Sequence, residues 1–367
     1  MKKVWIIPIE PLEERYTEQW YRQIPKAFEY MGFDVTTIDG TTLTDYVKVG
    51  AFLDMNSTVA YKNSQMAQVA ELFHTGKITD GDIFWVSDME YWGLESLRLM
   101  SQLNKINIKI YAFCHAASWT IEDAFSVASP YQKYTELGWI AACDKVFVGS
   151  QYHKQAIIDR RIKPYAAKED QASLSSKIIV SGNPIFSDDY PEIICKKKQQ
   201  VIISNRFDWE KRPNLSLDFC YILKKKHPDW SFIVTTGRKE FRSNKKWLTD
   251  YALSLQQDGV ISIYSGLSKA EYHQHLAESK IMLSNSIEES FGYCPVEAMI
   301  YGTFPILRNA FSHPELVNNC ERFLFDDEDE IVEKIEYLME NEIYVRPYAE
   351  KYFKSLSKII DVIRSES

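Results

Sequence analysis

Short apolar runs alternate along the 367-residue chain with segments whose apolar residues recur at helical spacing. This rhythm is typical of βα units arranged around parallel sheets. The apolar spacing of Trp20, Ile24, Phe28 and Met31 predicts a helix over 17–31. Strands are expected at 4–9, 33–38, 83–86, 108–113, 145–148, 177–180, 201–204, 231–235, 261–264, 281–283 and 304–307.

A polar stretch in the middle of the chain separates two such series of elements. It runs from Asn183 to the three lysines at 196–198, and a new apolar run follows. We therefore expect an α/β protein with two Rossmann-like domains, 1–190 and 191–343, and a helical segment at 344–367 that could cross back to the first domain. Folds of this class place ligands at the carboxyl ends of their strands, so a cleft between the two sheets is expected.

Composition and charge narrow the function classes. The apolar share of 45% excludes a disordered or collagen-like chain. A net charge of -8 excludes a generally basic protein that coats nucleic acid, although it leaves room for a local cationic track. The six cysteines are scattered without a CxxC pair, and no apolar run is long enough to span a membrane. We expect no structural metal site, no membrane insertion, a first segment that is a strand rather than a leader, and a cytoplasmic location.

The most informative segment is 284–307, where a strand is followed by a glycine-containing loop and a short helix. Glu289 precedes Gly292, and Glu297 follows eight positions after Glu289, on the helix. Glu297 could accept two vicinal hydroxyls, while Glu289 and the backbone N–H groups of Phe291 to Tyr293 could hold a polar ring and a phosphate. The alternative is that both glutamates are solvated surface acids.

The flanks and spacing of these glutamates resemble the E-x7-E signature of the retaining, family 4-like nucleotide-sugar glycosyltransferases with the GT-B fold. The resemblance implies that Glu289 contacts the donor sugar and has a catalytic role. It also implies that Glu297 binds the donor ribose. The backbone N–H groups of Phe291, Gly292 and Tyr293 are expected to form the loop for the donor sugar and phosphate.

A second segment, 202–213, resembles the G-R-x-x-x-x-K diphosphate clamp of the same family. Arg206 and Lys211 occupy the two cationic positions, and Asn205 stands where the family usually has glycine. Two cations at the end of a strand suit a diphosphate whose charge grows as the glycosidic bond breaks.

A third match lies in the first half, where His115 follows an expected strand. Similar enzymes keep a histidine there near the reacting sugar, which implies a catalytic role for His115. The clearest departure from the family is after the first strand, where Pro8-Ile9-Glu10-Pro11 replaces the usual glycine-rich loop.

The resemblance implies sugar transfer with retention at the anomeric carbon, with the leaving diphosphate receiving the acceptor proton. The co-substrate is a nucleotide diphosphate sugar, with a UDP-sugar expected first, and no other cofactor is implied. No pair of carboxylates is placed for double displacement. No metal-binding DxD pattern has a suitable context, so metal independence is expected.

The sequence indicates the acceptor less clearly than it indicates the donor. The chain looks similar to bacteriophage-encoded members, some of which glycosylate hydroxymethylated DNA bases, and this would place it in the host cytoplasm. Trp92 and Trp119 are acceptor-side candidates, since a flipped base stacks on aromatics. Further aromatic candidates are Tyr91 and Tyr131, and two basic groups could bind phosphates, Arg160, Arg161 and Lys163 together with Lys239, Arg242, Lys245 and Lys246.

Several alternatives stay open. A saccharide or small-molecule acceptor is as well supported as DNA. The chain could also be a non-catalytic nucleotide-sugar or DNA-binding module on a GT-B scaffold, or a sugar-nucleotide epimerase on a similar fold. The sequence does not determine the sugar, UDP against GDP, or the oligomeric state.

Overall fold

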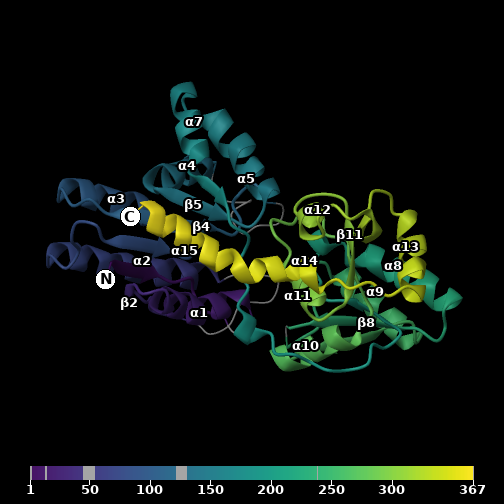
Figure 1. Ribbon diagram of the computed structural model, residues 1–367. Helices are drawn as coiled ribbons and strands as arrows, with labels where there is room; N and C mark the ends of the chain where they lie inside the picture. Colours follow the sequence, from purple (N-terminus) through teal and green to yellow (C-terminus); the bar gives the residue numbers. More distant parts are fainter. Residues whose placement is uncertain (1, 13–14, 44–53, 121–129, 238, 367) are drawn as a thin grey trace. The chain divides into compact units, whose positions relative to one another are not determined.

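A computed structural model describes residues 2–12, 15–43, 54–120, 130–237 and 239–366. The chain divides into two compact units (Figure 1). Unit 1 comprises Met1–Phe186 together with Lys354–Ser367, and unit 2 comprises Ser187–Phe353. Each unit has its own parallel sheet covered by helices.

Unit 1 contains a six-stranded parallel sheet in the order β2-β1-β3-β4-β5-β6. All four residues of β3 are buried because helices cover both faces of the sheet. The register pairs Ile6 with Trp85 and Trp85 with Tyr111, so the carboxyl ends of β1, β3 and β4 share one edge. The strands are β1 (Lys3–Ile7), β2 (Asp34–Thr37), β3 (Ile83–Val86), β4 (Lys109–Cys114), β5 (Lys145–Val148) and β6 (Ile178–Val180).

Alternate residues of these strands face two separate hydrophobic clusters, as the two-residue period of a strand requires. Trp5 and Ile7 belong to the cluster shared with α2, α3 and α4. Val4 and Ile6 belong to the cluster shared with α1 and α15. The helical elements are α1 (Tyr16–Tyr30), α2 (Met55–His74), α3 (Leu94–Leu103), α4 (Gln132–Ala142), α5 (Gln151–Ile157), the π-helical turn η1 (Ile158–Ile162), α6 (Lys163–Tyr165), α7 (Lys168–Ser176) and α15 (Ser355–Glu366).

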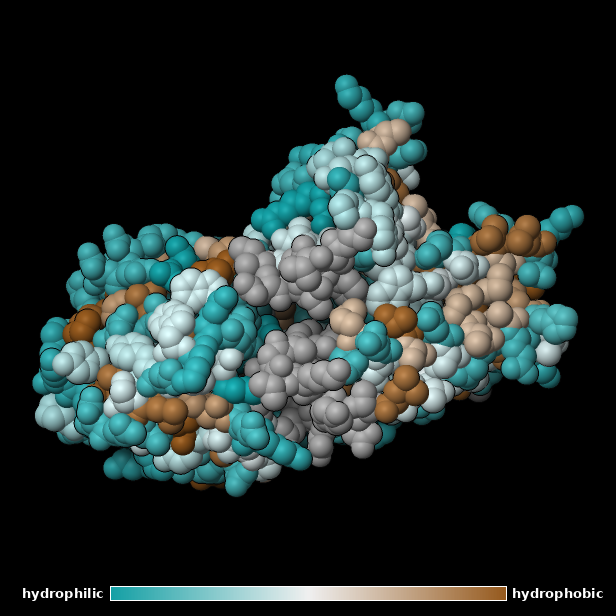
Figure 2. Space-filling view, turned by 180° about the vertical axis from the view of Figure 1, so that it is seen from behind, coloured by the Kyte–Doolittle hydropathy of each residue, from teal (hydrophilic) through white to brown (hydrophobic). Residues whose placement is uncertain are grey.

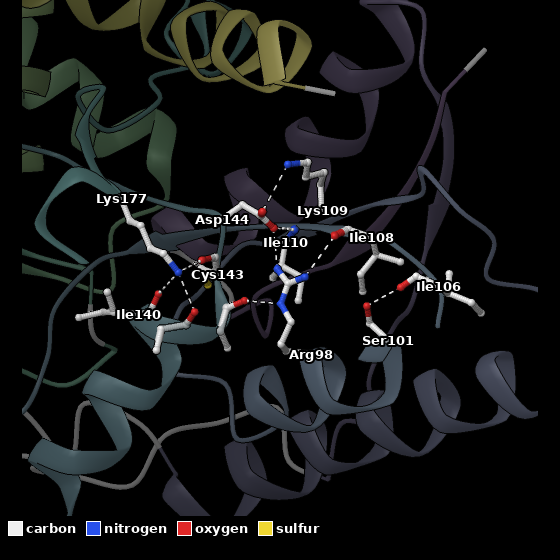
Figure 3. Close-up of polar contacts among 12 residues, drawn as sticks. Arg98, Ser101, Ile106, Ile108, Lys109, Ile110, Ile140, Cys143, Asp144 and Lys177 are labelled. Carbon is white, nitrogen blue, oxygen red and sulfur yellow. Dashed lines mark hydrogen bonds and ion pairs between the residues drawn. The ribbon is translucent and has the colours of Figure 1, made fainter. Parts of the chain in front are cut away.

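A polar network ties helices to the amino-terminal edge of this sheet (Figure 3). Arg98 of α3 donates to the carbonyls of Ala142 (2.9 Å) and Ile108 (3.2 Å) and to the carboxylate of Asp144 (2.6 Å). The ammonium of Lys177 donates to carbonyls at the end of α4, including Ala141 at 2.7 Å. These bonds satisfy carbonyls that the helix leaves unpaired, so the network fixes the edge opposite to the strands' carboxyl ends.

Unit 2 contains a second six-stranded parallel sheet, in the order β12-β11-β10-β7-β8-β9. Its core includes Ile202, Ile233 and Met282 from three neighbouring strands, with Leu276 and Ala298 from helices. Because β7 and β10 are parallel neighbours, the loops that follow them lie side by side. The strands are β7 (Gln200–Ile203), β8 (Ser231–Thr236), β9 (Ser262–Ser265), β10 (Ile281–Ser284), β11 (Phe304–Arg308) and β12 (Leu324–Phe325).

The helices of unit 2 include several short 3-10 turns. The α-helices are α8 (Pro213–Lys226), α9 (Lys246–Gln257), α10 (Lys269–Glu278), α11 (Tyr293–Ile300), α12 (His313–Leu316), α13 (Glu330–Glu340) and α14 (Arg346–Glu350). The 3-10 turns are η2 (Ser187–Asp189), η3 (Trp209–Lys211), η4 (Glu321–Phe323) and η5 (Lys351–Lys354).

The structure confirms the expected fold class of two parallel sheets covered by helices. Every expected strand is present with ends that differ by at most two residues, and among the strands that the structure describes only the two-residue β12 was not expected. The segment expected as one helical segment over 344–367 contains instead α14, η5 and α15. Pro347 lies in the first turn of α14, where proline is tolerated, and the 3-10 turn separates the two α-helices.

Exposed large hydrophobic side chains are scattered over several elements, with Leu99 and Leu103 of α3 among them. On the face shown in Figure 2, hydrophobic residues occur in separate small groups among hydrophilic ones. Among the described helices, none combines the length and apolar content that a membrane span requires.

Candidate functional site

The loop after β7 carries both expected diphosphate-binding cations. Arg206 lies in the loop itself, and Lys211 ends the turn η3. Arg212 follows in the left-handed region (φ 45°, ψ 52°), and Pro213 begins α8. A left-handed conformation is costly for a residue with a side chain, and such strain concentrates at functional sites. This turn sets the direction of Lys211 relative to the sheet.

Arg206 is held by acidic residues from its own loop. Its guanidinium lies 2.7 Å from Glu210 Oε1 and 3.8 Å from Asp208 Oδ2. Both acids are buried, whereas the Arg206 side chain is 35% exposed. The charged head of Arg206 is thus fixed at the carboxyl end of β7 while part of it still faces solvent.

Lys211 and Glu289 form an ion pair across the edge of the sheet. Lys211 Nζ donates to Glu289 Oε2 at 2.8 Å, which joins the loop after β7 to the loop after β10. A second bond joins the same loops, from the Ile287 amide to the Glu210 carbonyl at 2.9 Å. The structure therefore brings together Arg206, Lys211 and Glu289, three residues that the sequence singled out in separate motifs.

The charge state of Glu289 follows from its surroundings. Burial raises the pKa of this carboxyl, but Lys211, His313 and Arg206 outweigh burial and the net pKa lies below the ordinary value. Glu289 is therefore ionised at neutral pH. In this arrangement the carboxylate holds Lys211, and any anion that binds the ammonium would have to compete with Glu289.

Gly292 allows the close turn between Glu289 and α11. Its φ is 98°, and a Cβ at this position would lie 2.9 Å from Leu316 Cδ1. The neighbouring Phe291 is buried, and its carbonyl accepts a hydrogen bond from Ser312 Oγ at 2.8 Å. Tyr293 is the first residue of α11. The loop of Phe291, Gly292 and Tyr293 is thus braced by the segment that follows β11.

The expected ribose ligand, Glu297, is almost fully buried on α11. Its carboxylate accepts hydrogen bonds from Tyr190 (3.0 Å), Lys269 (3.2 Å) and Tyr272 (3.0 Å). Burial raises the pKa of Glu297, whereas Lys269, His273 and the two tyrosines lower it by more than burial raises it. The net pKa is therefore below the ordinary value. The ionised carboxylate already has three donors, so a ligand hydroxyl would have to share or displace them.

His115 follows β4 in unit 1. Its Nε2 lies 2.9 Å from the Ser87 carbonyl, and since a carbonyl only accepts, Nε2 carries the proton. Burial lowers the pKa of His115, and the attraction to Asp88 and to the Ser87 carbonyl does not restore it. His115 is therefore neutral, and its ring packs against Trp20 at a centroid distance of 4.5 Å.

The two acceptor-side tryptophans have different surroundings in unit 1. Trp92 has the ammonium of Lys62 5.2 Å from its ring centroid. Trp119 has the guanidinium of Arg161 4.7 Å from its ring centroid. Both rings are partly buried against the cluster of α2, α3 and α4.

Two acceptor expectations are wrong. Arg161 is buried and bound to the buried Glu136 and to Ser118 Oγ, so it does not belong to an exposed phosphate-binding patch. Tyr91 is 2% exposed and packs in the core, because the turn after β3 directs it inward. Neither side chain can stack on or bind a nucleic acid in this structure.

Sequence reasoning missed one residue beside the donor motifs, His313. Its Nδ1 donates to the Arg308 carbonyl at 3.1 Å, so its Nε2 carries a lone pair. That Nε2 is buried and has no hydrogen-bond partner among the described residues. Burial lowers the pKa of His313 to about 4, against the attraction of Glu289. The sequence contained only the run Ser312-His-Pro-Glu-Leu as a signal, and this run did not indicate that the start of α12 brings the His313 ring close to Glu289.

The other missed residues pair with the predicted ones. They are Glu210 and Asp208 around Arg206, and Tyr190, Lys269 and Tyr272 around Glu297. Within the described ranges, no three His, Cys, Asp or Glu side chains gather in a way that could hold a metal ion.

Residues 189–355 match the family model described as "Glycosyl transferases group 1". The match covers the segment that carries Arg206, Lys211, Glu289 and Glu297. No curated protein sequence matches the chain.

Solved structures match over all or most of the chain at low identity. Sucrose-phosphate synthase from Thermosynechococcus elongatus matches with a TM-score of 0.67 and 13% identity, over 100% of this chain and 99% of that chain. The lipopolysaccharide outer core galactosyltransferase WaaB in its apo form matches with a TM-score of 0.68 and 14% identity, over 100% of each chain. The pneumococcal O-GlcNAc transferase GtfA, in complex with UDP and GlcNAc, matches with a TM-score of 0.57 and 14% identity. The match covers 82% of this chain and 60% of that chain. The chain thus has the GT-B fold, and its residues 189–355 carry the similarity to group 1 glycosyl transferases.

Proposed function

We propose that this chain is a glycosyltransferase that transfers a sugar from a nucleoside diphosphate sugar to an acceptor hydroxyl. One observation carries the proposal: the segment that matches group 1 glycosyl transferases contains the Lys211–Glu289 ion pair, with Arg206 beside it. UDP is the proposed nucleotide, since the structural neighbour GtfA is described with UDP and GlcNAc.

In the proposed reaction, Arg206 and Lys211 bind the diphosphate. Their charge stabilises the leaving group as the glycosidic bond breaks, and this kind of preorganised stabilisation is worth about 2.7–4 kcal/mol for one donor. Glu289 releases Lys211 when the donor binds and then contacts the sugar. Glu297 binds the ribose, and the loop of Phe291 to Tyr293 lies beside the sugar and phosphate.

Retention at the anomeric carbon is part of the proposal. The described carboxylates around Lys211 are engaged with cations, and none pairs with a second acid in the arrangement of a double-displacement glycosidase. The departing diphosphate is therefore proposed to take the acceptor proton. A catalytic role for His115 is likewise proposed, and as a neutral imidazole it offers hydrogen bonds rather than charge.

A hydroxymethylated pyrimidine in DNA is the less favoured acceptor. Two of the side chains expected to bind it, Arg161 and Tyr91, are buried. We therefore propose an acceptor of the saccharide or small-molecule class.

The test is a panel of UDP-, GDP- and ADP-linked hexoses and pentoses, with release of nucleoside diphosphate as the readout. We expect turnover with one donor, and proton NMR of the product should show the anomeric configuration of that donor. Arg206→Ala should reduce turnover at least a hundredfold. Arg346→Ala is the matched control, because Arg346 also pairs with a glutamate four residues away and is 39% exposed.

Three outcomes would contradict the proposal. No transfer and no hydrolysis of any donor would favour a non-catalytic binding module. A donor whose sugar changes without consumption of an acceptor would indicate an epimerase. Near wild-type turnover of Arg206→Ala would remove this arginine from the diphosphate site.

A further inference from the structure

A cavity of about 560 Å³ in unit 1 is lined by residues of α4, α6 and α7. Its volume lies within the range of about 300–1,000 Å³ that is typical of small-ligand sites. The lining includes Tyr134, Gly138 and Ala141 of α4 and Asp170 and Ser173 of α7, and all five are exposed to solvent. A ligand can therefore reach these residues directly from the surface.

The cavity has two matched helical walls. Its lining positions are 134, 137, 138 and 141 on α4, and 170, 173, 174 and 177 on α7 and the residue that follows it. Each set has the spacing of a single helix face. A Cβ at Gly138 would meet no atom within 4 Å, so the space beside this residue is open. From 134 to 141 the wall of α4 extends over about 10 Å, and the cavity is accordingly a groove along the helix.

Two tyrosine rings stand at one end of this groove. The centroids of Tyr134 and Tyr165 are 5.7 Å apart and their planes are inclined by 71°. The two residues are 58% and 36% exposed. Lys133 Nζ lies 5.3 Å from the Tyr134 centroid and 4.9 Å from the Tyr165 centroid, within the range of a cation–π contact. These contacts hold the rings in place before a ligand arrives, which lowers the entropic cost of binding.

The polar lining of the groove favours a neutral ligand. Among the described residues, neither the Asp170 carboxylate nor the Ser173 hydroxyl takes part in a hydrogen bond or ion pair. The ammonium of Lys177, at the other end of the groove, already donates to the carbonyls of Ala141 (2.7 Å) and Cys143 (2.6 Å) (Figure 3). The accessible groups are thus oxygen atoms that bind hydroxyl groups, and the carboxylate repels anions.

Aromatic rings beside a carboxylate and a hydroxyl match the two kinds of surface that a sugar ring presents. The C–H groups of the sugar pack on aromatic rings, and its hydroxyl groups donate to the carboxylate. We propose that this groove is a binding site for a neutral saccharide, separate from the donor motifs of unit 2. Tyr134 and Tyr165 contact the sugar ring, and Asp170 accepts hydrogen bonds from its hydroxyl groups. This binding goes beyond the proposed sugar transfer and needs no nucleotide sugar.

The first experiment measures binding to the full chain in the absence of a donor. Maltose, cellobiose, lactose and chitobiose are titrated by calorimetry and by saturation-transfer difference NMR. Maltose 1-phosphate is the anionic probe, and hexanol is the apolar probe. We expect saturable binding of at least one neutral disaccharide, with a higher affinity than either of the two other probes.

The second experiment fills the groove with Gly138→Leu. The new side chain enters open space, and leucine is a better helix former than glycine, so this variant should be at least as stable as the unmodified protein. We expect it to lose saccharide binding. Gly138→Ala is the matched control, because it removes the same glycine and adds only one methyl group, and it should keep most of the binding.

The third experiment removes an aromatic contact with Tyr134→Ala. Loss of one such contact should weaken saccharide binding by about twofold to tenfold. Tyr337→Ala on α13 is the matched control, because Tyr337 is 45% exposed and lies in unit 2, and it should leave binding unchanged. Asp170→Asn should weaken the binding of the disaccharide and reduce its advantage over maltose 1-phosphate.

Each result decides the proposal, and thermal unfolding monitors the folding of every variant. Saturable binding that Gly138→Leu abolishes and both controls keep supports it. Absence of binding of all four disaccharides, or unchanged binding in folded Gly138→Leu or Tyr134→Ala, overturns it. Tighter binding of hexanol or maltose 1-phosphate overturns the ligand class. Because these outcomes do not depend on turnover, an absence of sugar transfer would overturn the proposed function alone.

Discussion

Replacing Lys211 by methionine separates the electrostatic role of this lysine from its catalytic role. The ammonium and the Glu289 carboxylate are 2.8 Å apart, and their side chains are 14% and 21% exposed. At an effective dielectric constant of about 20, two unit charges at this distance attract by about 6 kcal/mol before desolvation is subtracted. Removing one partner of a buried pair costs about 3–5 kcal/mol, because the other charge is left without compensation.

Since both side chains keep some contact with solvent, we expect Lys211→Met to destabilise unit 2 by about 3 kcal/mol. For a unit of this size, this corresponds to a fall in Tm of about 6–12 °C. Loss of a cation from the diphosphate should also reduce kcat by about a hundredfold to a thousandfold. Calorimetry measures the first effect, and release of nucleoside diphosphate measures the second.

The double variant Lys211→Met/Glu289→Gln tests the reasoning. Removing the uncompensated carboxylate should restore most of the stability, while turnover stays low because the clamp is still incomplete. Lys246→Met is the control, since Lys246 pairs with Asp250 but is 84% exposed, and an exposed pair contributes less than about 1 kcal/mol. Turnover of Lys211→Met within about threefold of the unmodified protein, or turnover that returns with stability in the double variant, would refute the clamp.

Two further predictions follow from the same geometry. Gly292→Ala should destabilise the protein by about 1–3 kcal/mol, because a Cβ would meet Leu316 at 2.9 Å with φ at 98°, whereas Gly138→Ala in the open face of α4 should be neutral or slightly stabilising. Buried histidines take up protons in the unfolded chain near pH 6.5 but not in the fold, so stability should fall as pH drops from about 6.5 towards 4, by on the order of 2 kcal/mol for each at pH 5. Equal Tm values at pH 7 and pH 5 would contradict this reasoning. The histidines are His153, with its pKa lowered to about 3, and His273 and His313, with theirs lowered to about 4.

The sequence predicted the layered fold well because its central strands are buried on both faces. Strands of this kind appear as continuous apolar runs, and Ile83–Val86 and Lys145–Val148 were expected with the bounds that the structure has. The two-residue β12 has no such run, since it adds only an edge to the sheet. The sequence also indicated a division near residue 190, and the structure divides the chain between Phe186 and Ser187.

The candidate site could be predicted only in part. The residues of the donor motifs were visible because their spacing along the chain is local, as with Glu289 and Glu297. Their partners were not visible, because Lys211 and Glu289 are 78 positions apart, and Tyr190 and Glu297 are 107 apart. Such contacts depend on the order of strands in the sheet, which a single sequence does not specify.

The sequence by itself determined the element types, the two-sheet architecture and the positions of the charged residues near strand ends. Only the tertiary structure decided which charges meet. It paired Lys211 with Glu289, buried Arg161 on Glu136, and placed Lys62 between Asp88 and Trp92. The physical reason is that local periodicity reports which face of an element is buried, whereas ion pairs across a parallel sheet arise from strands and helices that are distant in sequence and adjacent in space.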